Sequence, residues 1–324
     1  MEMKKVLILL AVALIVAGSA VAATSAKNKK ETTANKEAVS QKPVEIVIVA
    51  DPEYTAGQED PQLTAGLAQY LKATPSVKVL SVQEAAADEE ISKISYDFLP
   101  LYLIKKTDEV REKFAEPISM GYLQESENYV ILAHQTRTGV YANKKAKPNV
   151  MELFVMSQCP YGVMAENLII QAKKDGKLPN GKDIKIRYIV SYDDQKGFSS
   201  LHGSGEWEEN VRQLLIAKYY PEKLWKYLEI RNKDYRSSRW DKAMEAAGIN
   251  VSKISKKFDT EGLELLKAEA AYGNEYGVSG SPTFLWEGKV QMDLGSASKI
   301  PGFEFLNPNA ARAGAQVAAP TGSC

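Results

Sequence analysis

The sequence MELFVMSQCPYG, residues 151–162, decides the fold of this chain. Its first six residues form an apolar run typical of a buried strand, and the stretch from Pro160 to Ala172 has the spacing of an amphipathic helix. Cys159 therefore stands where a strand ends and a helix begins. Free backbone N–H groups and the helix dipole stabilise a thiolate at that position, so we expect the thiol pKa to fall below its usual value of about 8.5.

The first half of the chain repeats this order of elements without a cysteine. The expected elements are strands at 44–49 and 77–82 and helices around 63–71 and 84–94. A shift of 105 residues places Tyr54 on Cys159 and Gly57 on Gly162. We interpret this similarity as an internal duplication in which the first copy has no thiol.

Each half also contains an apolar segment that a proline enters, Pro100 in residues 97–104 and Pro282 in residues 277–286. For Pro282, an ordinary proline at the start of a strand is one of two interpretations, and the other follows from a resemblance given below. Strands expected at 128–133 and 139–142 would complete the sheet of the first half. In the second half, strands are expected at 183–190 and at 289–294, the latter after a hairpin turn at Glu287-Gly288. This order of elements predicts an α/β fold with two tandem domains.

The second half is longer than the first between these landmarks. Tyr54 and Pro100 are 46 residues apart, whereas Cys159 and Pro282 are 123 apart. The additional residues, about 197–275, have helical periodicity, so we predict a helical subdomain inserted into the second domain. We expect its aromatic side chains to form a core rather than a ligand cage, namely Tyr219, Tyr220, Trp225, Tyr227 and Trp240.

The composition suits two globular domains. The chain has 324 residues, of which 44% are hydrophobic and 25% are charged. Lysine plus arginine and aspartate plus glutamate are equal at 41 each, so no basic surface points to nucleic acid. The predicted domains are residues 44–148 and 149–306, with a disordered tether at 24–43 and a flexible tail at 307–324.

Residues 1–23 have the pattern of a secretory signal peptide. A basic start is followed by a short apolar run and by small residues around Ala20 and Ala22. The uncharged stretch continues to Ala26 and is long enough to span a bilayer, so an uncleaved anchor is the alternative. We therefore expect an exported protein, periplasmic or extracellular, which contacts a membrane only through such an anchor.

The chain has only two cysteines, Cys159 and Cys324, so disulfides do not staple the fold. In an oxidising compartment an exposed thiol is a reactive group, and we expect Cys159 to be one. The alternative is a buried, inert cysteine. Neither the cysteines nor the two histidines have a zinc-binding spacing, so no metal site is predicted.

The motif, the proline segment and the helical insertion together resemble the thioredoxin superfamily, and within it the exported oxidoreductases of the DsbA type. The resemblance covers nearly all of residues 149–300. It implies that Cys159 is the attacking thiol and that Pro282 is a cis-proline beside it. It also implies that Ser281 pairs its backbone with an incoming peptide. The departure is Gly162, which stands where that family has its resolving cysteine, and this argues against a dithiol oxidase.

Two neighbours of the cysteine belong to the same predicted site. Pro160 follows it directly, and Tyr161 is expected to be exposed near the thiol, where it shapes access. Because the phenol stays protonated at neutral pH, Tyr161 is a poor base.

Residues 202–210 also resemble a second family. His202-Gly203, Glu206 and Asn210 are similar to the signature of the interferon-inducible lysosomal thiol reductases, although the cysteines that flank it there are absent. His202 is expected to cap or orient the start of the first inserted helix. The carboxylates of Glu206, Glu208 and Glu209 are expected to be solvated, as is usual near helix starts.

Three functions remain open for a single thiol. In the first, Cys159 exchanges mixed disulfides with a protein or a small thiol, as in the single-cysteine glutaredoxins that Cys-Pro-Tyr resembles. In the second, Cys324 is a distant resolving thiol, since a tail of about 17 residues spans roughly 20–25 Å. In the third, the domain is a redox-inactive peptide-binding or chaperone-like module, as the thiol-free first copy suggests.

The expected partners follow from this chemistry. They are cysteine-containing proteins or peptides, and no nucleic acid is among them. No cofactor is expected, and glutathione or another small thiol is the candidate co-substrate.

Overall fold

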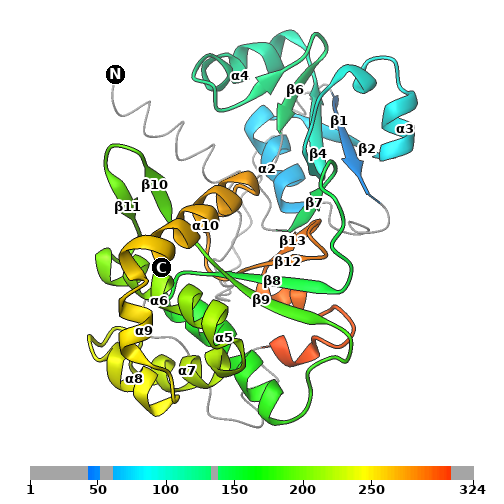
Figure 1. Ribbon diagram of the computed structural model, residues 1–324. Coiled ribbons are helices and arrows are strands. Elements are labelled where there is room, and N and C mark those ends of the chain that lie inside the picture. The colour runs from blue at the N-terminus through cyan, green and yellow to red at the C-terminus, as the bar shows by residue number, and fades with distance from the viewer. Residues whose placement is uncertain (1–42, 52–60, 133–137, 308–324) are drawn as a thin grey trace, which may run out of the picture. The chain divides into compact units, whose positions relative to one another are not determined.

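The computed structural model describes residues 43–51, 61–132 and 138–307. They belong to two compact units, residues 1–143 and 144–324, and each unit contains a mixed β-sheet with helices (Figure 1). Over these three ranges, no helix is long and apolar enough to cross a membrane.

Several predicted features lie outside the described residues. They are the signal peptide at 1–23, the tether apart from Pro43, the tail apart from Asn307, and the landmarks Tyr54 and Gly57. Pro43 itself is the first residue of a strand rather than the last residue of a tether.

The first unit is built on a five-stranded sheet. Its strands, in spatial order, are β2 (Thr74–Ser81), β1 (Pro43–Ala50), β4 (Leu101–Lys105), β6 (Tyr129–Leu132) and β5 (Gln124–Glu125). β1 runs parallel to β2 and antiparallel to β4. Ile46 of β1 packs in one buried cluster with Leu67 of α2 (Pro61–Leu71) and Phe114 of α4 (Asp108–Ser119). The predicted first strand and first helix are confirmed.

The helix predicted around 84–94 is shorter in the structure. α3 (Val82–Ala87) begins with a capping box, in which Ser81 and Glu84 each accept the other's backbone N–H. It ends at Asp88, whose carboxylate accepts the N–H groups of Glu90 and Ile91. Because this local bonding competes with a continuing helix, a separate 3-10 turn follows at residues 91–93.

The helix α4 was not predicted, and no element was assigned to residues 105–127. Its buried residues, Val110, Phe114 and Pro117, do have the spacing of a helix, but Pro117 lies inside the helix, where a proline usually marks a break. The start of the helix is fixed by Thr107, whose Oγ1 accepts the N–H of Val110 at 3.2 Å.

Thr107→Ala is expected to destabilise α4 by about 1 kcal/mol, because a free helix N–H loses its acceptor. Thr107→Ser keeps the hydroxyl and serves as the matched control. Hydrogen exchange of the α4 amides in the full chain measures the effect, which should be several-fold faster exchange in the alanine variant alone. Equal exchange in both variants would contradict the capping role.

The predicted strand at 97–104 is divided in two by Pro100, which has no N–H to donate to a ladder. β3 (Phe98–Leu99) pairs with β7 (Gly139–Tyr141), whereas β4 pairs with β1. The prediction that residues 139–142 complete the sheet of β1 is therefore wrong. Gly139 permits this pairing, because a Cβ there would lie 2.2 Å from the carbonyl oxygen of Leu99.

The second unit has a sheet whose strands, in spatial order, are β13 (Val290–Met292), β12 (Thr283–Trp286), β8 (Val150–Val155) and β9 (Asp183–Tyr188). β8 is parallel to β9 and antiparallel to β12. Residues 287–289 join β12 to β13, and Glu287 and Gly288 of this tight hairpin turn both have positive φ.

The sheets of the two units share their strand order and register. Val49 pairs with the residue after Pro100, and Phe154 pairs with the residue after Pro282. Val49 and Phe154 are related by the same shift of 105 residues that the sequence predicts. The peptide bonds preceding both prolines are cis. Both units are thioredoxin-like, which agrees with the predicted fold class.

The predicted insertion is helical, as Figure 1 shows for the second unit. Its helices are α6 (Ser204–Tyr219), α7 (Leu224–Arg231), α8 (Trp240–Ala246), α9 (Val251–Ser255) and α10 (Leu263–Glu275). Residues 197–199, at its predicted start, instead form β11 in a hairpin with β10 (Ser191–Asp193).

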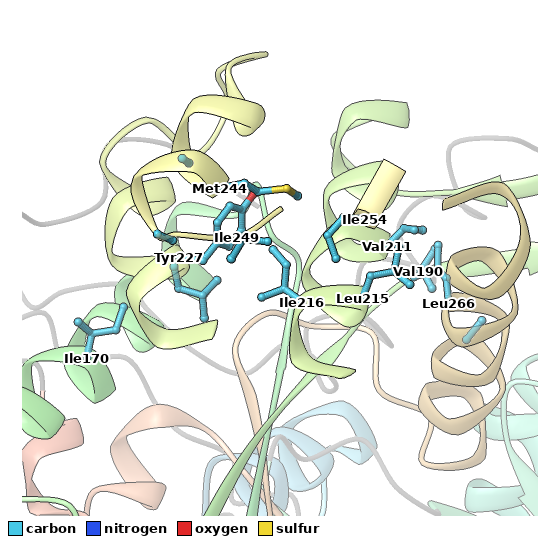
Figure 2. Close-up of a cluster of buried hydrophobic side chains, with 14 residues drawn as sticks. Ile170, Val190, Val211, Leu215, Ile216, Tyr227, Met244, Ile249, Ile254 and Leu266 are labelled. Atoms are coloured by element: carbon cyan, nitrogen blue, oxygen red, sulfur yellow. The ribbon is translucent and has the colours of Figure 1, made fainter. Parts of the chain in front are cut away.

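The insertion has its own hydrophobic core. Figure 2 shows side chains from several helices converging there, among them Val211, Leu215, Tyr227 and Met244. Tyr227 is fully buried, and the other four predicted core aromatics are partly buried against the same cluster. The prediction that these rings form a core is confirmed.

Candidate functional site

Cys159 occupies the place that the sequence predicts. It is the N-cap residue of α5 (Pro160–Lys174), directly after the strand β8, and Pro160 is the first helical residue. Proline suits that position because its fixed φ is helical and its missing N–H would have no partner there. The carbonyl oxygen of Cys159 accepts the N–H of Val163 at 3.0 Å and so closes the first turn of the helix.

The expectation of an exposed thiol is wrong for this structure. Cys159 is 0% exposed, and its sulfur is disulfide-bonded, so no free thiol titrates there. The sequence has one other cysteine, Cys324, which lies outside the described residues.

The proline loop lies against the cysteine, as predicted. The sulfur of Cys159 is 3.6 Å from the carbonyl oxygen of Ser281, the residue before Pro282. The hydroxyl of Ser281 accepts the N–H of Met156 at 3.0 Å, so the loop is also bonded to the end of β8. Cys159 and Ser281, which are 122 positions apart in the sequence, thus form one site.

Gly162 is buried, and the space around it is occupied. A Cβ at this position would lie 2.5 Å from Oγ of Ser281 and 3.2 Å from the carbonyl oxygen of Met156. A larger residue therefore requires Ser281 to rotate and to give up its hydrogen bond with Met156. The hydroxyl of Ser281 therefore fills the space beside Gly162.

Tyr161 is the exposed member of the motif. Its side chain is 39% exposed, whereas Cys159, Pro160 and Gly162 are buried. The expected exposure of Tyr161 is confirmed.

The turn before the cysteine is bonded to the helical insertion. The N–H of Gln158 donates to Oε2 of Glu206 at 3.0 Å, and the hydroxyl of Ser157 donates to the carbonyl oxygen of Glu206 at 3.2 Å. His202 also contacts this carboxylate, with Nδ1 2.7 Å from Oε2. His202 thereby orients the start of α6, which agrees with its predicted role.

The expectation that the three carboxylates at the start of α6 are solvated is wrong for two of them. Glu206 and Glu209 are fully buried, because each has several hydrogen-bond donors within the unit. Glu208 is more exposed and pairs with Arg212 at 3.0 Å. Glu206 was therefore missed as a site residue, although its spacing of four from His202 is a signal for such a contact.

Another group of buried polar side chains lies on α5, α6 and α7. Glu166 accepts the amide of Asn232 at 2.8 Å, and Glu209 accepts the hydroxyl of Tyr227 at 2.7 Å. Burial raises the pKa of Glu166 to about 7, and the charge of Glu209 adds to the shift against the effect of Asn232. Near neutral pH the Glu166 carboxyl group is therefore partly protonated and partly ionised.

A buried ion pair supports the sheet beneath the site. Glu152 of β8 pairs with Arg187 of β9 at 2.7 Å and accepts the hydroxyl of Tyr272 of α10 at 2.7 Å. Burial opposes its ionisation, but these two partners outweigh burial and hold the pKa of Glu152 below its usual value. Arg187 also pairs with Glu269 of α10 at 2.8 Å. These contacts fix α10, which leads into the loop that carries Ser281.

Within the ranges that the structure describes, no group of three or more histidine, cysteine, aspartate or glutamate side chains could hold a metal ion. The chemistry that the site offers is that of one sulfur at a helix N-terminus beside a proline loop.

Comparisons with known proteins find similarity only among solved structures. No family model matches the chain, and no curated protein matches it. SrgA of Salmonella enterica serovar Typhimurium is 15% identical with a TM-score of 0.38, and the match covers 54% of this chain and 96% of SrgA. The DsbA disulfide interchange protein of Klebsiella pneumoniae is 15% identical with a TM-score of 0.36, covering 56% and 95%.

A third similar structure is DsbA of Proteus mirabilis with a non-covalently bound peptide. It is 12% identical with a TM-score of 0.39, and the match covers 56% of this chain and 95% of that one.

Proposed function

We propose that this chain is an exported protein that carries out thiol–disulfide exchange through Cys159, by way of mixed disulfides with cysteine-containing proteins or peptides. The observation that carries the proposal is the position of the Cys159 sulfur, at the N-terminus of α5 and 3.6 Å from the proline loop. Free N–H groups at that helix end stabilise the thiolate that attacks, and the backbone of Ser281 is placed to align a substrate peptide.

The proposed reaction needs no cofactor. The Cys159 thiolate attacks a substrate disulfide RSSR′, forms the mixed disulfide Cys159–S–S–R, and expels R′S⁻. A second thiolate then attacks the Cys159 sulfur and expels RS⁻. The substrate disulfide is thereby reduced, and the protein's two thiols are oxidised.

We propose Cys324 as the second thiol. Cys159 is disulfide-bonded, and Cys324 is the other cysteine of this sequence. Its attack on the mixed disulfide would leave a Cys159–Cys324 disulfide. Glutathione or another small thiol would replace it in a chain without Cys324.

The proposal is tested by reducing the protein, adding oxidised glutathione and following intact mass with time. Cys324→Ser is expected to gain one glutathione and keep it, because no second thiol resolves the adduct. The wild type should pass through this adduct to an internal disulfide. Cys159→Ser is the matched control and should react at the slow rate of an ordinary thiol. If the two single-cysteine variants react equally fast, the proposed role of Cys159 is wrong.

A second candidate function is a redox-inactive peptide-binding module. It is favoured by the burial of Cys159 and by the crowding around Gly162, which leaves no space for a cysteine at position 162. This function predicts that a cysteine-containing peptide binds the wild type and Cys159→Ser with equal affinity. It also predicts negligible reaction of the reduced protein with oxidised glutathione.

A further inference from the structure

Both backbone polar groups of Gln158, the residue before Cys159, are bonded to side chains of the helical insertion. Its N–H donates to Oε2 of Glu206 at 3.0 Å, and its carbonyl oxygen accepts Nη2 of Arg236 at 3.3 Å. The hydroxyl of Ser157 adds a third bond, to the carbonyl oxygen of Glu206. The position of the cysteine therefore depends on the insertion as well as on its own strand and helix.

Glu206 is the centre of this connection. Its carboxylate is 0% exposed, and a buried carboxylate is stable only where donors surround it. His202 supplies two of them, with Nδ1 2.7 Å from Oε2 and its backbone N–H 3.4 Å from Oε1. Because Oε2 accepts from both His202 and Gln158, the imidazole fixes the oxygen that holds the turn.

The opposite side of the same turn is held by the proline loop. Ser281 bonds the N–H of Met156, and its carbonyl oxygen lies 3.6 Å from the sulfur. Residues 156–159 are thus fixed between two elements, and a change on the side of Glu206 moves the sulfur relative to Ser281. Disulfide exchange requires the attacking sulfur to approach in line with the disulfide that breaks, and a misplacement of about 1 Å slows such a reaction by about 100-fold.

We propose that Glu206, oriented by His202, is a positioning residue for Cys159: it holds the backbone of Gln158 so that the sulfur faces the proline loop. The inference rests on the proposed function of Cys159 in disulfide exchange. It assigns to the helical insertion a role in that reaction, which is to set the geometry of the attacking group without touching the substrate.

The test measures glutathione adduct formation at Cys159 in the Cys324→Ser background. Glu206→Ala removes the acceptor and is expected to slow the reaction by about 10–100-fold. Glu206→Gln keeps an oxygen acceptor of the same length and should restore most of that rate. His202 is tested in the same way. His202→Ala removes the partner of Glu206 and should slow the reaction, whereas His202→Asn should not, because its side-chain amide can replace the Nδ1 donor.

A second readout is hydrogen exchange of the backbone N–H of Gln158. It should become at least about tenfold faster in Glu206→Ala, which removes the acceptor of this N–H, and in His202→Ala, which releases that acceptor from the imidazole. The two conservative variants should keep the protection. The unfolding temperature of all four variants is recorded. If Glu206→Ala does not fold, the comparison of His202→Ala with His202→Asn decides the test, because the His202 side chain is 14% exposed and tolerates substitution better than the buried Glu206.

The outcomes separate this inference from the proposed function. No adduct in the Cys324→Ser background would refute the proposed function itself. An adduct that forms at one rate in all variants would refute only the positioning role, and so would Glu206→Gln reacting as slowly as Glu206→Ala.

Discussion

Gly162→Ala is expected to destabilise the second unit by about 2 kcal/mol, although alanine usually stabilises a helix relative to glycine. The new Cβ would lie 2.5 Å from Oγ of Ser281. The hydroxyl must then rotate away, and the N–H of Met156 loses its partner, which costs about 1–3 kcal/mol. Urea unfolding of the full chain, followed by a probe in the second unit, measures the loss.

The matched control is Gly273→Ala in α10, a helical glycine of the same unit with no atom within 4 Å of the added Cβ. It should be neutral or stabilising by up to about 1 kcal/mol. A double-mutant cycle identifies the cause, because Gly162→Ala combined with Ser281→Ala should cost less than the two single changes added. Additive losses would show that Ser281 is not what excludes a larger residue.

Glu166→Gln is expected to stabilise the protein by about 3 kcal/mol at pH 8 and to have little effect at pH 5. The pKa of Glu166 is about 7 in the folded state and near 4.5 in the unfolded state. The folded state therefore binds the proton more tightly, and stability falls as pH rises from 4.5 through 7. Each unit of pKa difference corresponds to about 1.4 kcal/mol. Glutamine does not ionise, and its oxygen still accepts the amide of Asn232.

The measurement is the unfolding temperature of wild type and variant at pH 5 and pH 8. A gain of about 3 kcal/mol corresponds to roughly 6–12 °C at pH 8. Glu264→Gln on the exposed face of α10 is the control and should change the unfolding temperature little. A difference between wild type and Glu166→Gln that is the same at both pH values would contradict the assignment.

The strands and the repeated order of elements could be predicted because their signals are local. β-branched and apolar runs define β1 and β8, and the two prolines, Pro100 and Pro282, mark equivalent registers in the two sheets. The insertion was also predictable, since apolar residues that keep a helical spacing over many turns are specific to helices. By contrast, α4 has that spacing over only two turns, at Val110, Phe114 and Pro117, and the proline within it argues against a helix.

The site was predictable only in part, because its missing members depend on contacts between distant residues. Nothing near Gly162 in the sequence shows that Ser281 fills the space beside it. Glu206 looks like an ordinary acidic residue at a helix start, and only the fold reveals that it binds the turn at Gln158. Burial of Cys159 has the same origin, since it is set by packing of segments that are far apart in sequence.

The N-cap position of Cys159 carries a consequence for helix stability. The side chain of Cys159 makes no capping hydrogen bond, whereas serine at an N-cap typically stabilises a helix by about 1 kcal/mol relative to a residue that cannot cap. In the reduced protein, Cys159→Ser should therefore protect the first turn of α5 more strongly than the native residue does. The native sequence therefore leaves this helix end without a side-chain cap, and under the proposed function the negative charge of the reduced Cys159 thiolate would supply the missing stabilisation.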